Sequence, residues 1–169
     1  QVVGFEAALG QHGFFPLHAF LWDKGVLTDL GTLHGDGNSI AQDINNRGQV
    51  LVESGVDPSV GTSAFIWDHG VVTELGTLGG HEIAPIQINN RGQVVGIATV
   101  LGEGFHPFLW DSGKLRDLGS LGTFCCAVAI HDAGLIIAST VNEQTPHVFI
   151  WNGTSWDAIG VPGAFSGSF

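Results

Sequence analysis

The chain has 169 residues, of which 44% are hydrophobic and 12% charged, and it contains 26 Gly. This mixture excludes an intrinsically disordered chain and is typical of a turn-rich all-β domain. The formal net charge is −11, with only five Lys and Arg, so the basic surface that a nucleic-acid-binding protein needs is missing. The sequence starts at Gln1 without Met, which we interpret as a mature or excised piece rather than a primary translation product.

One segment recurs four times along the chain. Each copy begins with an apolar run that ends in Trp, which is followed by Asp or Asn and a turn that contains Gly. A second short apolar stretch then ends at another Gly. The four copies cover residues 18–33, 63–78, 106–121 and 147–160. A second block, which contains an Asn-Asn-Arg-Gly turn in its best copies, alternates with the first and covers residues 39–52, 83–96 and 125–137. The chain opens on the tail of this second block, at residues 1–4.

Taken in chain order, the two blocks predict four short strands in each unit. In the second unit we expect strands over 39–45, 49–54, 63–68 and 71–78, because Val, Ile, Phe and Trp fill them and Asn and Gly separate them. The first of these carries small residues, as expected of the innermost strand. No segment has a sustained helical period, so almost no helix is predicted. No apolar run is long enough to span a membrane.

A period of roughly 44 residues with four strands and a Trp-Asp pair is typical of a β-propeller blade. The sequence therefore predicts an all-β chain that forms one propeller domain of four four-stranded blades. The expected blades are 1–35 together with 163–169, then 36–80, 81–122 and 123–162. One blade cannot bury both of its apolar faces alone, so the blades must stack.

The two chain ends leave three hypotheses open. The C-terminal segment could complete blade 1 and close the ring, it could complete a neighbouring subunit by strand addition, or the chain could be part of a longer array. The strands concerned are Gln1, Val2, Val3 and Gly4 at one end and Ser166, Gly167, Ser168 and Phe169 at the other.

The repeat resembles the HAF-repeat family of probable extracellular bacterial proteins. The resemblance rests on His18-Ala19-Phe20, on the Asp-Leu-Gly-Thr-Leu run from Asp29, and on the Ile-Asn-x-x-Gly-Gln-Val-Val-Gly run from Ile88. The fourth copy departs most, with Asn152 in place of Asp. The resemblance implies export to the cell exterior and a propeller-like fold, and it supplies no catalytic residues. The blade plan is also similar to that of WD-repeat proteins.

Histidines and carboxylates are the candidate metal ligands and catalytic groups of the sequence. His18, His106 and His147 share one repeat position, which favours a role in the fold, and no spacing predicts a zinc site. His34 and His81 are expected in loops after the fourth strand, and the run from Asp36 to Asn38 is interpreted as a turn rather than a Ca²⁺ loop. We expect the Asp after each Trp to cap its hairpin through backbone N–H groups. The sequence predicts no metal, no cofactor and no catalytic residue.

Cys125 and Cys126 are the only cysteines and are adjacent. Three states stay open for them: two buried thiols, a strained vicinal disulfide, or cross-links to another chain or a cofactor.

The absence of a convergent acid, base or nucleophile favours a non-catalytic binding scaffold for a protein or glycan partner. Contact residues are expected in the loops at 8–17, 56–62 and 101–105, where the aromatic residues Phe14, Phe15 and Phe105 lie outside the repeat pattern. The alternative is a structural subunit that assembles into an extracellular filament, sheath or matrix through its end strands.

Overall fold

The structure is a computed structural model that describes residues 1–7, 17–33, 37–57, 61–122, 125–142 and 145–159. These residues form antiparallel strands and no helix. Each sheet is one blade of the repeat. Blade 1 contains β1 (Val2–Ala7), β2 (Leu17–Asp23) and β3 (Val26–Asp29), and blade 2 contains β4 (Ser39–Ile44), β5 (Val50–Asp57), β6 (Gly61–Asp68) and β7 (Val71–Glu74). Blade 3 contains β8 (Gly79–Ile88), β9 (Val94–Val100), β10 (Gly104–Asp111) and β11 (Lys114–Asp117), and blade 4 contains β12 (Cys125–Ile130), β13 (Ile136–Asn142), β14 (Thr145–Trp151) and β15 (Trp156–Ile159).

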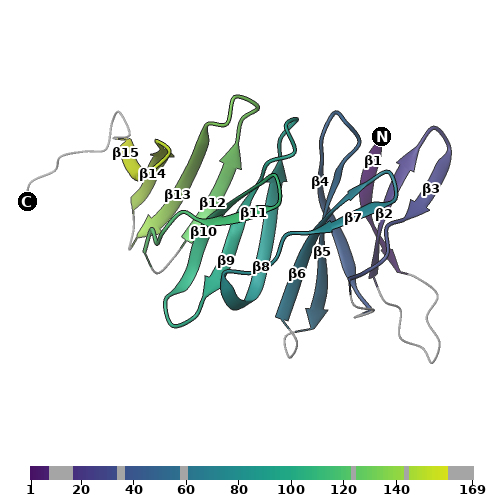
Figure 1. Ribbon diagram of the computed structural model, residues 1–169, viewed down its shortest axis with the longest axis horizontal. Helices are drawn as coiled ribbons and strands as arrows, with labels where there is room; N and C mark the ends of the chain where they lie inside the picture. The colour runs from purple at the N-terminus through teal and green to yellow at the C-terminus, as the bar shows by residue number, and fades with distance from the viewer. Residues whose placement is uncertain (8–16, 34–36, 58–60, 123–124, 143–144, 160–169) are drawn as a thin grey trace, which may run out of the picture.

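The four sheets stack in a row, in chain order, with blade 1 and blade 4 at opposite ends (Figure 1). Three apolar clusters fill the spaces between consecutive blades. The third strand of blade 2 shows why the blades must stack, because the successive residues Ala64, Phe65 and Ile66 are all buried. Neighbouring residues of a strand point to opposite faces, so this strand needs an apolar partner on both sides. The predicted all-β propeller architecture is confirmed.

Tight turns join the third and fourth strands of the first three blades. The turn pairs are Lys24-Gly25, His69-Gly70 and Ser112-Gly113, and all six residues have positive φ. Positive φ at both central positions defines a type I′ turn, whose twist matches that of the two strands it joins. These turns lie on the same side of the row as the turns between first and second strands, at residues 45–49, 89–93 and 131–135 (Figure 1). We call this side the turn face and the opposite side the loop face.

Two details of the predicted blades differ from the structure. Blade 1 has three strands in the part of the chain that is described, and Ser166, Gly167, Ser168 and Phe169, which were expected to complete it, lie outside that part. The fourth strand of blade 2 ends at Glu74 rather than at residue 78. It ends there because Gly76 has a φ of 80° and Leu75 turns into the core, where its amide donates a hydrogen bond to the Ala64 carbonyl at 2.9 Å.

The first strand of blade 3 also differs from the prediction. It begins at Gly79, so His81 and Glu82 lie in β8 rather than in a loop. Gly79 pairs with Val100 of the neighbouring strand, and the register shifts before Ile83 pairs with Ala98. The sequence pattern of the block starts only at Ile83, which is why the irregular first part of β8 was not recognised. A search for long apolar helices that could cross a membrane found none among the described residues.

Candidate functional site: a cleft between blades 2 and 3

A cleft of about 510 Å³ opens on the turn face between blades 2 and 3. Blade 2 supplies its turns and outer strands to one wall, and blade 3 supplies a Trp and two turns to the other. The lining residues are Arg47, Gln49, Ile66, Asp68, Val71, Thr73, Arg91, Gly92, Trp110 and Ser112. The lining thus joins an aromatic ring to charged and amide groups, a combination that suits a polar ligand with a flat or apolar part.

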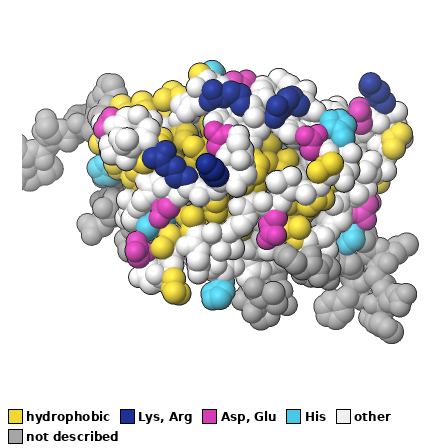
Figure 2. All heavy atoms as spheres, viewed as in Figure 1, with side chains coloured by type: hydrophobic (Ala, Val, Ile, Leu, Met, Phe, Trp, Pro, Cys, Tyr) yellow, Lys and Arg dark blue, Asp and Glu magenta, His cyan; other side chains and the backbone are white. Residues whose placement is uncertain are grey.

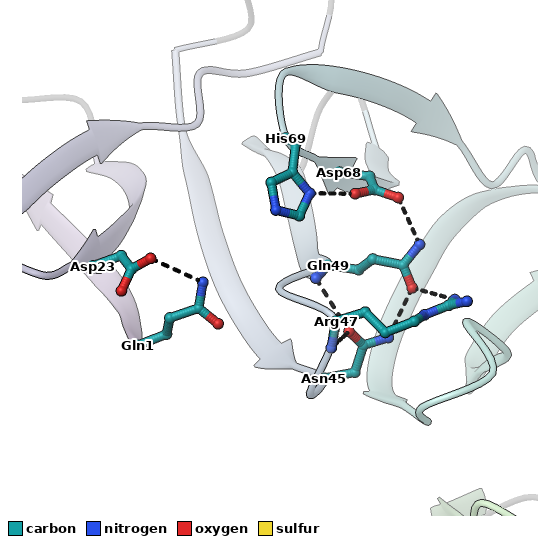
Figure 3. A network of polar contacts seen from close by, with 7 residues as sticks. All are labelled: Gln1, Asp23, Asn45, Arg47, Gln49, Asp68 and His69. Atoms are coloured by element: carbon teal, nitrogen blue, oxygen red, sulfur yellow. Dashed lines mark hydrogen bonds and ion pairs between the residues drawn. The ribbon is translucent and has the colours of Figure 1, made fainter.

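A hydrogen-bonded network fixes the polar wall of the cleft (Figure 3). The Arg47 guanidinium donates to Gln49 Oε1 at 2.6 Å, and Gln49 Nε2 donates to Asp68 Oδ2 at 2.8 Å. Asn45 also donates to Gln49 Oε1, at 2.8 Å. Because the amide of Gln49 is bonded at both ends, it holds the cation and the carboxylate at fixed places within one blade.

The carboxylate of the cleft is ionised at neutral pH. Hydrogen bonds from His69 and then from Gln49 lower the pKa of Asp68, and the nearby Arg47 charge lowers it further. Asp111 of blade 3 has the same arrangement, since hydrogen bonds from Gln93 and then from Ser112 lower the pKa of its carboxyl.

The Asn-Asn-Arg-Gly turns position this network from one blade to the next. Within each turn, Asn45 or Asn89 accepts two backbone N–H groups through its side-chain oxygen. Each side-chain nitrogen then reaches the neighbouring blade, where Asn45 donates to the Asn89 carbonyl at 2.9 Å and Asn89 donates to the His131 carbonyl at 3.2 Å. The repeated Asn is therefore a connection between blades as well as a turn former.

The glycine of the turn is a second point of contact between neighbouring blades. The Arg47 guanidinium lies against Gly92 of blade 3, where an added Cβ would come within 2.6 Å of its terminal nitrogen. Arg91 lies in the same way against Gly134 of blade 4. The two glycines also have positive φ, of 82° and 87°.

Two of the repeat histidines, His18 and His106, have a structural role on the loop face, as their shared position predicted. His18 Nδ1 lies 2.8 Å from Asp29, and His106 Nδ1 lies 3.0 Å from both carboxylate oxygens of Asp117. The same aspartates accept the backbone N–H of Gly31 or Gly119. This pairing links the His of the third strand to the Asp-Leu-Gly run after the fourth, so it explains two motifs of the repeat together.

The aspartates that follow each Trp do not act as predicted. In the described hydrogen bonds, Asp68 and Asp111 accept side-chain donors instead of capping their hairpins through backbone N–H groups. Asp23 accepts from Gln1 at 3.4 Å in the same arrangement (Figure 3). The type I′ turn explains the difference, because two residues with positive φ close it without a side-chain cap. The longer turn of blade 4 does use a cap, since Asn152 accepts the backbone N–H groups of Thr154 and Ser155.

The predicted contact residues remain predictions. Phe105 lies in β10, next to a short turn at 101–103, and its side chain is 39% exposed. Phe14 and Phe15 lie outside the described residues, as do His34 and Asp36. Cys125 and Cys126 begin β12, and their side chains also lie outside the description. Gln1, Val2, Val3 and Gly4 lie at or in β1, which pairs with β2.

Sequence reasoning missed the cleft because its residues belong to the repeat. Arg47 was interpreted as a turn residue, Gln49 as the first residue of a strand, and Trp110 as one of four repeated Trp residues. The signal that could have found the site is a difference between copies. The fourth strand has Arg116 in blade 3 but Thr73 at the same place in blade 2.

The two faces of the row differ in charge. All five Lys and Arg lie in the turns of the turn face or in β11 directly after one, at positions 24, 47, 91, 114 and 116. Figure 2 shows these dark blue side chains in the upper half of the view, where Figure 1 places the turns. The loop face therefore carries acidic groups such as Asp29, Glu82 and Asp117 without a Lys or Arg to offset them. A basic partner would be attracted to such a molecule.

Comparison with solved structures identifies the architecture. The chain superposes on the acylaminoacyl peptidase of Pyrococcus horikoshii with a TM-score of 0.64 and 17% identity, over 96% of this chain and 26% of that one. It also superposes on the β-propeller domain of the Trilobed protease from Pyrococcus furiosus, described as having an open velcro topology, with a TM-score of 0.63 and 14% identity. That match covers 98% of this chain and 51% of the propeller domain.

The chain thus spans about half the length of that propeller domain and about a quarter of the peptidase. No family model matches the sequence, and a search of curated proteins found no match. At these identities the likeness shows the fold alone, and the chain is a β-propeller-type array of four blades.

Proposed function

We propose that the protein is a non-catalytic extracellular binding scaffold that holds a partner in the cleft between blades 2 and 3. The observation that supports this function is an open, polar and aromatic cleft whose walls are held rigid by hydrogen bonds. Rigid walls reduce the entropy lost on binding, which is a property of preorganised binding sites. The resemblance of the repeat to HAF-repeat proteins is the basis for placing the protein outside the cell.

The proposal is tested by labelling the protein and applying it to arrays of peptides and glycans. A Thr73→Arg variant, which places a long side chain into the cleft from an exposed strand position, is applied in parallel. We expect the native protein to retain a discrete set of ligands and the variant to lose them. Ligands that bind equally to both would overturn the cleft as the binding site, and the absence of any ligand would overturn the scaffold.

Self-assembly is a second candidate, and it is favoured by the two ends of the row. Leu51 and Val95 are fully buried in their blades, whereas Ile137 at the same pairing position of blade 4 is 42% exposed. At the other end Val2 is 54% exposed, whereas its counterpart Val50 is fully buried. In blade 2, β5 pairs with β4 on one side and with β6 on the other. Its counterpart β1 pairs with β2 and has no second partner among the described strands. Each end is therefore one half of a blade-to-blade interface.

A second copy of the chain could supply the other half at both ends. We expect light scattering to show particles larger than one chain, and an Ile137→Glu variant to be smaller because it places a charge in the interface. Val26→Glu is the matched control, since Val26 lies in β3, the exposed outer strand of blade 1. A native protein that stays monomeric at high concentration would contradict self-assembly.

A further inference from the structure

The groove between blades 3 and 4 shows how this protein fills the space that is open between blades 2 and 3. Arg116 of β11 lies over the Trp151 ring, with its guanidinium carbon 5.4 Å from the ring centre. Its terminal nitrogen donates to the Gly153 carbonyl at 2.9 Å. The guanidinium thus combines a cation–π contact with a hydrogen bond to the backbone of the next blade.

Strand pairing defines the equivalent positions between blades 2 and 3. Arg116 pairs with Leu109, the residue before Trp110, and Thr73 pairs with Ile66, the residue before Trp67. Thr73 therefore stands where Arg116 stands. By the same alignment Trp110 corresponds to Trp151 and Ser112 to Gly153. These three counterparts, Thr73, Trp110 and Ser112, all line the open cleft.

Trp110 is 8% exposed in the core cluster between blades 2 and 3, and its cross-strand partner is Leu115, where Trp151 has Trp156. In blade 4, Trp151 contacts Arg116 and also Trp156, whose ring centre is 5.2 Å away. In blade 2, the Trp67 ring stacks on His69 at 6.1 Å. At the position of His69, blade 3 has Ser112, so Trp110 has no histidine ring stacked on it from its own turn.

The charges of the two grooves indicate what the open cleft lacks. Lys114 and Arg116 of blade 3 are replaced by Val71 and Thr73 in blade 2, whereas Arg91, which also lines the open cleft, stands where blade 4 has Ala133. The open cleft therefore has one positive charge fewer than the groove between blades 3 and 4. The carboxylate of Asp68 is retained, as Asp111 is in the other groove. Arg47 corresponds to Arg91, which lies beside a groove that already contains Arg116, and Arg91 is a second cation in the lining of the open cleft.

We infer that the cleft between blades 2 and 3 takes the guanidinium group of an arginine side chain presented by a partner protein, in the place that Arg116 takes between blades 3 and 4. The inference rests on the proposed binding function and names its ligand class. A guanidinium suits the place better than an ammonium group because it is planar, stacks on an aromatic face and still directs N–H groups sideways to a backbone carbonyl.

The test uses the native chain labelled with ¹⁵N and follows the indole N–H signals of its five Trp residues after triple-resonance assignment. N-acetyl-arginine methylamide is titrated, and the corresponding lysine and glutamate compounds serve as probes of charge and shape. We expect the arginine compound to shift the Trp110 signal saturably and the lysine compound to bind several-fold more weakly. A shift with the glutamate compound alone would overturn the inference in favour of an anion bound by Arg47.

Two variants at the same strand position make the test specific. Thr73→Arg should weaken binding of the arginine compound at least about tenfold, because the new side chain fills the cleft from within. Thr28→Arg, at the corresponding place of blade 1, should leave the binding unchanged. Equal binding by the native chain and the Thr73→Arg variant, or no shift of the Trp110 signal at any concentration, would overturn the inference.

The outcomes separate this inference from the proposed function. Array ligands that lack arginine but are lost in Thr73→Arg would overturn the arginine assignment and leave the binding scaffold in place. Binding of the arginine compound with no macromolecule retained on any array would overturn the scaffold and leave the guanidinium site.

Discussion

Truncating one repeat position in two different blades measures how much stability the stacking of the blades contributes. Leu118 follows the fourth strand of blade 3 and is 3% exposed between blades 3 and 4. Ile159 occupies the same position in blade 4 and is 40% exposed, because no described blade packs against it. Leu118→Ala and Ile159→Ala both remove three carbon atoms, so the chemistry of the change is matched and the environment differs.

The expected losses follow from these exposures. Removing three buried carbon atoms costs about 2.4 kcal/mol in transfer free energy. A cavity closed on all sides adds about 1 kcal/mol at Leu118, for a total of about 3–4 kcal/mol. Ile159→Ala leaves no closed cavity. Because Ile159 is already 40% exposed, its truncation loses only about three fifths of the transfer free energy, or about 1.4 kcal/mol. The two variants should therefore differ by about 2 kcal/mol in the free energy of unfolding.

Urea unfolding followed by circular dichroism measures the difference, and thermal melts should separate the two variants by about 4–8 °C. Leu30→Ala and Leu75→Ala, at the same buried position of blades 1 and 2, should resemble Leu118→Ala. Equal losses at Leu118 and Ile159 would refute the reasoning. They would mean that the end face of blade 4 is covered in solution, and the self-assembly candidate would then gain support.

Three further predictions concern the turns. Gly92→Ala and Gly102→Ala both place Ala at a φ of 82°, and each should lower the free energy of unfolding by about 1–2 kcal/mol. In urea unfolding Gly92→Ala should cost more than Gly102→Ala, because its Cβ also displaces Arg47 of blade 2. Equal costs would contradict the contact between Arg47 and Gly92. Asn89→Ala should cost about 2–4 kcal/mol, since it leaves the backbone N–H groups of Arg91 and Gln93 without this acceptor and removes the hydrogen bond to the His131 carbonyl of blade 4. A loss below about 1 kcal/mol would argue against the inter-blade connection. The hydrogen bond from Gln93 lowers the pKa of Asp111, so the stability that the ionised carboxylate contributes is present at neutral pH and is lost as the pH falls through the lowered pKa. Asp111→Asn should therefore flatten the loss of stability at acid pH. An unchanged acid limb of the pH–stability profile would contradict this role.

The repeat was readable from the sequence because it is written in residue types with strong local preferences. Trp, Phe, Ile and Val at alternate and successive positions define strands that need cover on both faces, and Gly after a polar residue defines the turns. These preferences act within a few residues, so the sequence by itself determined the all-β class, the four units and the approximate bounds of strands such as β4 and β6. The structural role of the repeated histidines also followed from their recurrence.

Contacts between residues about 40 apart were decided only by the tertiary structure. The sequence does not say that Asn45 reaches the next blade, that Arg47 lies on Gly92, or that Thr73 leaves open the space that Arg116 fills. Each of these depends on the distance and rotation between stacked sheets, which is set by how the side chains of both sheets pack rather than by local preference. Repetition predicts that neighbouring blades meet in similar ways, yet the copies differ at this strand position, where blades 1 and 2 have Thr28 and Thr73 and blade 3 has Arg116.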